Sequence, residues 1–155
     1  MVWTGRMGMC AMISPAVRIG NDRVRTVTLY DSEGEQMTIK VISGRLSQQE
    51  LKRLAQETYG EMIKALVDIK RDLLAVGGEL HADAKAILLD QSSRQENLWG
   101  INLYPDKSKA DRIEYTALIN VRPGQGNLSM EVKSPSLRRK IREIVNQRID
   151  WGDST

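Results

Sequence analysis

The sequence has only one cysteine and one histidine among its 155 residues, and it has no long apolar run. Because Cys10 stands alone, no intramolecular disulfide can form, which is typical of a reducing compartment and predicts a cytoplasmic protein. No apolar run approaches the roughly 18–20 residues of a membrane helix, and glycine, arginine, serine and proline interrupt residues 1–17, so we expect neither a membrane partner nor a secretory signal.

The motifs that identify many enzymes are also missing. The chain has no nucleophile elbow, P-loop, dinucleotide fingerprint, cysteine pair or paired-histidine zinc motif. A thiol enzyme is disfavoured further because Cys10 lies in the least patterned part of the chain. The composition is that of an ordinary soluble domain, with 41% hydrophobic and 28% charged residues. The net charge of +3 permits an RNA or DNA partner without indicating one.

Hydrophobic periodicity predicts the element order β-α-β-β-α-β-β-α within a single α+β domain over residues 37–150, followed by a tail at 151–155. Strands and helices do not alternate strictly, so we expect a mainly antiparallel sheet with about three helices packed on one face. The expected strands are 38–42, 62–69, 73–76, 98–104 and 113–121. Three helices are expected. Two begin after the caps Ser47 and Ser134, and one spans 80–90.

Residues 1–36 allow two interpretations. Residues 24–30 and 37–42 have strand-forming composition on either side of a turn, which predicts a hairpin arm. Alternatively, translation starts at Met37 and the first 36 residues are an extension from a mis-called start. A purine-rich run that resembles a ribosome-binding site can encode residues 33–36.

Polar side chains recur on one face of the last two expected strands. If these strands pair as a hairpin, their polar residues share one surface, which is either a ligand site or a solvated sheet face. Two of them are asparagines, which are depleted in strands. The loop at 122–129 contains one proline and two glycines and can wrap a ligand or act as a connector. The candidate ligand-binding residues are Trp99, Asn102, Tyr104, Glu114, Asn120, Arg122 and Asn127.

A second candidate site surrounds the single histidine. Glu79, His81 and Asp83 point the same way in an extended segment, where they could bind a divalent metal or perform acid–base chemistry. In a helix, His81 points away from the other two and has a capping or hydrogen-bonding role. In the catalytic interpretation His81 is the general acid or base, Glu79 or Glu96 is its partner, and Arg122 is an anion clamp.

Three stretches together resemble a small family of uncharacterised prokaryotic proteins, a domain of unknown function. They are GGELHADA at 77–84, QENLWGINLYP at 95–105 and INVRPGQGN at 119–127. The resemblance covers about residues 37–149, and residues 1–36 have no counterpart in it. It implies no activity.

Three functions therefore stay open. The first is a hydrolytic enzyme centred on His81. The second is a non-enzymatic binding module for a small polar ligand or for RNA, in which His81 is structural. The third is a toxin–antitoxin-like regulator, which only the size and basicity favour. The sequence identifies no cofactor and no oligomeric state.

Overall fold

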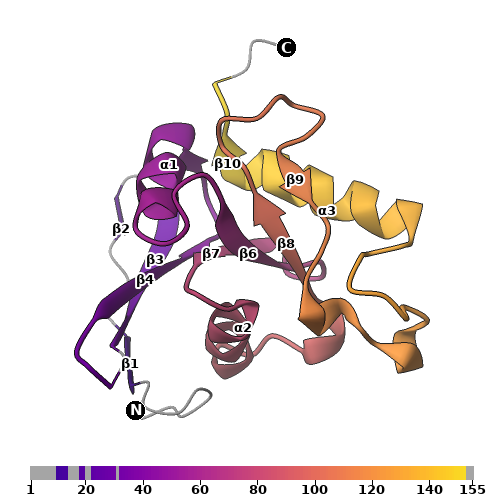
Figure 1. The fold of residues 1–155 in the computed structure, drawn as a ribbon, viewed down its shortest axis with the longest axis horizontal. Coiled ribbons are helices and arrows are strands. Elements are labelled where there is room, and N and C mark those ends of the chain that lie inside the picture. Colours follow the sequence, from indigo (N-terminus) through magenta and orange to yellow (C-terminus); the bar gives the residue numbers. More distant parts are fainter. Residues whose placement is uncertain (1–9, 14–17, 20–21, 31, 153–155) are drawn as a thin grey trace.

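The computed structural model describes residues 10–13, 18–19, 22–30 and 32–152, and it consists of one antiparallel sheet, a small parallel strand pair and three helices (Figure 1). Neighbouring strands of the sheet are antiparallel throughout. Its order is β1 (Cys10–Ile13), β3 (Asp22–Tyr30), β4 (Gln36–Ile42), β7 (Leu73–Gly77), β6 (Ile63–Asp68), β8 (Leu98–Leu103) and β9 (Ile113–Glu114), with β2 (Arg18–Ile19) paired to β3. The predicted α+β class and antiparallel sheet are confirmed.

The helices lie on both faces of the sheet, so the expectation of a single covered face was wrong. Helices α1 (Gln48–Gln56) and α3 (Pro135–Arg148) pack on one face, and α2 (His81–Asp90) packs on the other (Figure 1). The cause is visible in β7, where all five residues are buried and successive side chains enter opposite cores. A continuous apolar strand of this kind must be covered on both faces.

Local signals explain where the helices begin. The Ser47 hydroxyl accepts a hydrogen bond from the Glu50 backbone N–H at 3.1 Å, and Ser134 caps α3 at the Leu137 N–H in the same way. Proline at the first position of α3 costs no intrahelical hydrogen bond. After α3, β10 (Ile149–Asp150) pairs in parallel with β5 (Leu46–Ser47). No helix of the described residues is long and apolar enough to span a bilayer.

Strands β3 and β4 form the hairpin that was one interpretation of the N-terminal segment. They pair from Val24 with Ile42 to Tyr30 with Gln36, and Val27 and Leu29 are fully buried. Cys10 lies in β1. Where translation begins, and the domain boundaries expected with it, stay predictions.

The predicted strand at 113–121 was wrong beyond its first two residues. The chain leaves β9 after Glu114, bridges from Thr116 to Glu131, and then forms two short 3-10 turns, η2 (Leu118–Asn120) and η3 (Pro123–Gln125). A third such turn, η1 (Gln95–Asn97), precedes β8. Strand β9 therefore pairs with only the last two residues of β8. The rest of that edge of β8 has no neighbouring strand among the described residues.

Candidate ligand site

The open part of the β8 edge is closed by side chains instead of a strand. Strand β8 pairs with β6 along its whole length but with β9 only at residues 102 and 103. Beyond that point the Asn120 side chain accepts a hydrogen bond from the Gly100 N–H at 2.8 Å and donates one to the Gly100 carbonyl at 2.9 Å. The guanidinium of Arg122 donates to the Leu98 carbonyl. Both side chains thus replace the missing ladder of backbone hydrogen bonds.

Arg122 and Asn127 make further hydrogen bonds, most of them to the backbone. Arg122 donates to the carbonyls of Ile119 and Gln95 at 3.0 and 2.8 Å, and its guanidinium lies 4.4 Å from the centroid of the Trp99 ring. Burial lowers the pKa of Arg122 from its ordinary value. The Asn127 amide donates to the Asn120 and Ser129 carbonyls and accepts from the Lys133 N–H.

Four predicted ligand residues are therefore built into the fold: Trp99, Asn120, Arg122 and Asn127. Each is less than one-tenth exposed, and Trp99 belongs to the core beneath α1 and α3. Their structural contacts account for the polar residues that looked out of place in a strand. A direct contact with a ligand stays a prediction for these four.

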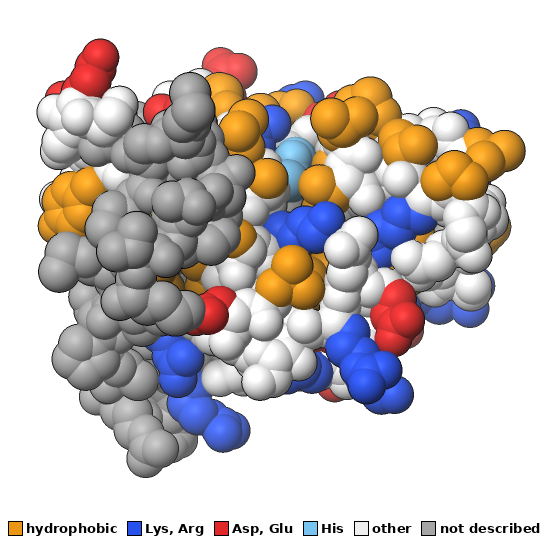
Figure 2. Space-filling view, turned by 90° about the horizontal axis from the view of Figure 1, so that it is seen from below, with side chains coloured by type: hydrophobic (Ala, Val, Ile, Leu, Met, Phe, Trp, Pro, Cys, Tyr) orange, Lys and Arg blue, Asp and Glu red, His pale blue; other side chains and the backbone are white. Residues whose placement is uncertain are grey.

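His81 is the first residue of α2 and packs against β8. Its Nε2 lies 2.8 Å from the Ile101 carbonyl oxygen, so Nε2 carries the proton and donates it. The ring lies directly over Gly100, because a Cβ added there would be 3.1 Å from His81 Cδ2. Figure 2 shows the pale-blue atoms of this single histidine recessed among their neighbours on the α2 side of the molecule.

Burial sets the charge of His81. It lowers the pKa of the imidazole to about 4, with Lys64 contributing in the same direction, while the Ile101 carbonyl, Asn102 and Glu114 oppose the shift. The ring is therefore neutral at pH 7. A neutral imidazole with one nitrogen engaged by the backbone fits the structural interpretation of this histidine.

The acidic residues predicted near His81 lie in three different environments. Glu79 is exposed and its carbonyl accepts from the Tyr59 hydroxyl. Asp83 is fully buried, and its Oδ2 accepts from the Leu80 N–H at 2.9 Å. Glu96 lies on η1, more than half exposed, 3.5 Å from Arg94. Among the residues that the structure describes, no three histidine, cysteine or carboxylate side chains are placed to hold a metal ion.

Asn102, Tyr104 and Glu114 are brought together as predicted. Asn102 and Glu114 are register partners across β8 and β9. The Tyr104 hydroxyl donates to Glu114 Oε2 at 2.7 Å and the Asn102 amide donates to the same oxygen at 3.2 Å. The hydrogen bond to Glu114 is the main cause of a raised pKa at Tyr104. Both donors use Oε2, so Oε1 has no hydrogen-bond partner among the described residues.

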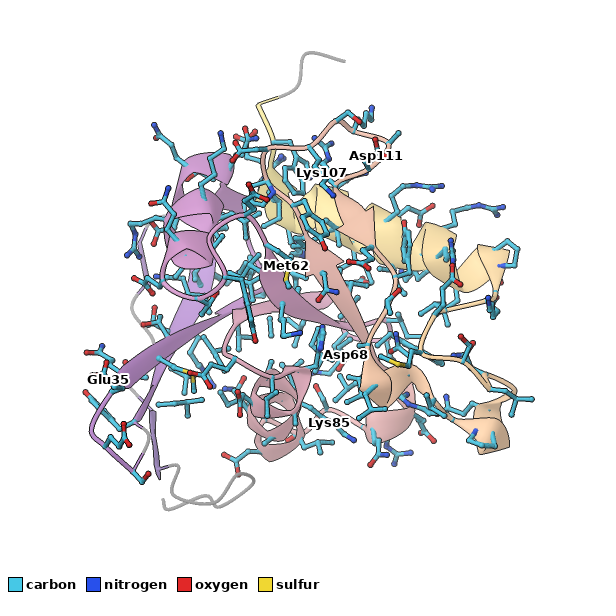
Figure 3. All side chains as sticks on the ribbon, viewed as in Figure 1. Glu35, Met62, Asp68, Lys85, Lys107 and Asp111 are labelled. Atoms are coloured by element: carbon cyan, nitrogen blue, oxygen red, sulfur yellow. The ribbon has the colours of Figure 1, made fainter. Side chains whose placement is uncertain are left out.

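A groove of about 680 Å³ opens beside Glu114. It lies along the outer edge of β9, and Figure 3 marks two of its residues, Lys107 and Asp111, on the loop that joins β8 to β9 on the side away from α2. We refer to this feature as the β9 groove. It is lined by Tyr104, Lys107, Ala110, Asp111, Ile113, Glu114, Tyr115, Thr116, Glu131 and Arg138.

Cations cover the two aromatic rings of the β9 groove. The Lys107 ammonium lies 3.9 Å from the centroid of the Tyr104 ring, and the Arg138 guanidinium lies 4.9 Å from that of Tyr115. Arg138 also donates to a Glu131 carboxylate oxygen at 2.5 Å. Hydrogen bonds from Lys133 and Arg138 lower the pKa of Glu131. The groove is thus polar, aromatic and of mixed charge.

Sequence reasoning missed most of this lining. Neither the loop at 105–112 nor Tyr115 was among the candidate residues. Glu131 and Arg138 come from a part of the chain far from 104–116 in sequence, and neither was a candidate residue. The one available signal was the pair of tyrosines on either side of a loop rich in charged residues.

Comparison with known proteins gives a family and no activity. No curated protein and no solved structure matches the chain. The model of a family described as "Protein of unknown function (DUF5674)" matches residues 40–148. This range runs from β4 to the last residue of α3, so it contains the β9 groove and all three helices. The chain therefore belongs to the DUF5674 family of proteins of unknown function.

Proposed function

We propose that this protein is a non-enzymatic binding module that holds a small polar ligand in the β9 groove. The observation that carries the proposal is the Glu114 carboxylate, which lines the groove and is held through Oε2, while Oε1 has no hydrogen-bond partner among the described residues. The groove volume of about 680 Å³ falls within the roughly 300–1,000 Å³ that is usual for small-molecule sites.

Preorganisation supports Glu114 as the main contact. The Tyr104 hydroxyl and the Asn102 amide hold the carboxylate from two sides, and Asn102 is itself buried. A carboxylate that is already oriented loses little rotational freedom when a ligand binds, so more of the interaction free energy appears as affinity. The ligand group that suits Oε1 is a hydrogen-bond donor.

A hydrolytic function has less support from the geometry. General acid–base catalysis is most effective when the pKa of the catalytic group lies near the working pH. The pKa of His81 is lowered to about 4, and its Nε2 is engaged by the Ile101 carbonyl. Glu96 lies on η1 and forms an ion pair with Arg94.

RNA binding also has less support. Three of the basic residues of α3 already make contacts within the chain. Arg138 bonds to Glu131, Lys140 bonds to Asp72, and Arg148 donates to backbone carbonyls. The toxin–antitoxin hypothesis gains no structural support beyond size and charge. We keep the cytoplasm as the proposed location on the ground of the single cysteine.

The test is a titration of the ¹⁵N-labelled full chain with single amino acids, monosaccharides, nucleosides, short-chain acids and short-chain amines. We expect at least one class to shift the backbone amide signals of Tyr104, Glu114 and Tyr115 in a saturable way. Glu114→Gln should weaken that binding, whereas Glu143→Gln, on an exposed position of α3 outside the groove, should not.

Two results would contradict the proposal. One is the absence of saturable shifts with every class of compound. The other is binding that shifts amides elsewhere in the chain and is unaffected by Glu114→Gln. Saturable binding of RNA that weakens steeply with added salt would favour the nucleic-acid alternative instead.

A further inference from the structure

We infer that the β9 groove selects a ligand with a protonated amine or guanidinium group, which contacts the Tyr104 ring and the Glu114 carboxylate, and that the Lys107 ammonium competes with this group for the Tyr104 ring. The inference rests on the proposed function, because it names the ligand class of the same groove.

Charge in the groove favours a cation. Three carboxylates line it, those of Asp111, Glu114 and Glu131, against two cations, those of Lys107 and Arg138. Arg138 is committed to Glu131 and to the Val132 carbonyl, at 2.5 and 2.6 Å. The charges that remain are the carboxylates of Asp111 and Glu114 and the ammonium of Lys107. An anionic ligand would meet this excess of negative charge, whereas a cation would neutralise it.

Aromatic geometry points to the same class. Each tyrosine ring of the groove already has a cation over it, which shows that one face of each ring is accessible to a positive charge. The Tyr104 ring and the Glu114 carboxylate are joined by the 2.7 Å hydrogen bond from the Tyr104 hydroxyl. A single ligand ammonium can therefore contact a π face and a carboxylate that belong to one rigid unit.

Lys107 and Arg138 differ in how firmly they are held. The Arg138 guanidinium has two hydrogen bonds in addition to its contact with Tyr115. Lys107 is exposed, and its ammonium lies over the Tyr104 ring without a hydrogen bond or ion pair to any other described residue. A cation–π contact at an exposed site contributes about 0.5–1 kcal/mol. A ligand cation can displace Lys107 at that small cost, but displacing Arg138 would break an ion pair as well.

The experiment compares four probes of similar size in NMR titrations of the full chain at pH 7. They are n-butylammonium, methylguanidinium, n-butanol and butyrate, followed at the amides of Tyr104, Glu114 and Tyr115. We expect the two cations to bind more tightly than n-butanol, and butyrate to bind least. Glu114→Gln should weaken the cations by about tenfold, as for the loss of a hydrogen bond to a charged group, and leave n-butanol unchanged.

Lys107→Met tests the competition directly. It keeps an unbranched side chain one atom shorter and removes the charge, so the affinity for n-butylammonium should rise by about two- to fivefold, the factor that corresponds to one exposed cation–π contact. Lys109→Met is the matched control on the same exposed loop, because Lys109 does not line the groove. It should leave the affinity unchanged.

The outcomes separate the inference from the proposed function. Groove binding of n-butanol or butyrate that equals or exceeds that of the cations would overturn the inference and leave the proposed function standing. Tighter cation binding with no gain in Lys107→Met would remove the competitor role of Lys107. No groove shifts with these probes or with any class of the wider panel would contradict both.

Discussion

Acidification to pH 5 should destabilise this protein through His81. The imidazole is buried over Gly100, its pKa is lowered to about 4, and the neutral form donates from Nε2 to the Ile101 carbonyl. In the unfolded chain the same group has an ordinary pKa of about 6.5. Between these two values the unfolded state binds a proton that the folded state does not bind. The free energy of unfolding therefore falls as the pH falls through this window.

The size of the effect follows from the two pKa values. A shift from about 6.5 to about 4 corresponds to a total loss of roughly 3 kcal/mol, and about 2 kcal/mol of it is lost between pH 7 and pH 5. The lowered carboxyl pKa values at Glu50 and Glu131 act in the same direction. They act below their ordinary value of 4.5, however, and so outside this interval.

Urea denaturation of the wild type and of His81→Gln at pH 7, 6 and 5 measures this contribution. Glutamine offers an N–H donor for the Ile101 carbonyl but does not titrate. We expect the wild type to lose about 2 kcal/mol over this range and the variant to lose much less. An NMR titration of the imidazole in the wild type gives the pKa directly, even if the variant folds poorly. A measured pKa at or above 6.5, or equal pH dependence in the two proteins, would refute the reasoning.

Two further predictions concern the β8 edge, and a third concerns the cation next to it. Gly100→Ala places a Cβ 2.5 Å from that of Ala117 and should cost about 1–3 kcal/mol of unfolding free energy, while Gly124→Ala, with no atom within 4 Å, is the matched control. Asn120→Ala leaves the Gly100 N–H and carbonyl without partners, removes one of the two donors to the Met130 carbonyl, and should cost about 3 kcal/mol or more in the same urea assay. Arg122→Lys cannot reproduce the fork of contacts to three carbonyls and should cost about 2 kcal/mol. A loss below 0.5 kcal/mol in Asn120→Ala or Arg122→Lys would contradict the role assigned to that side chain.

The sequence predicted most elements because their signals are local. The serine caps of α1 and α3 and the proline that opens α3 were readable from a few residues and were confirmed. The distribution of helices was not readable in this way. The run Leu73–Gly77 is apolar at every position, so it has no polar face that would have shown which side a helix covers. Only the assembled sheet shows that both faces are buried.

The predicted strand at 113–121 failed for a different reason. Its apolar residues alternate at the period of a strand, and that pattern continues past the point where β9 ends. Alternation reports which side chains face the core, but it does not report which group pairs with the neighbouring backbone. Here the Asn120 side chain makes the pairing, and its own backbone turns away into η2.

Polar residues in a predicted strand have two opposite meanings in this protein, and the lengths of the neighbouring strands separate them. Strand β8 has six residues and β9 has two, so the backbone of β8 needs substitute partners where β9 is absent. Asn120 and Arg122 supply them and are buried as a result. Glu114 lies where the ladder is intact, so the backbone of β8 has no need of its side chain. Its carboxylate is held in place by two donors and still has one oxygen available, and this is the reason to assign ligand binding to Glu114 and structural support to Asn120 and Arg122.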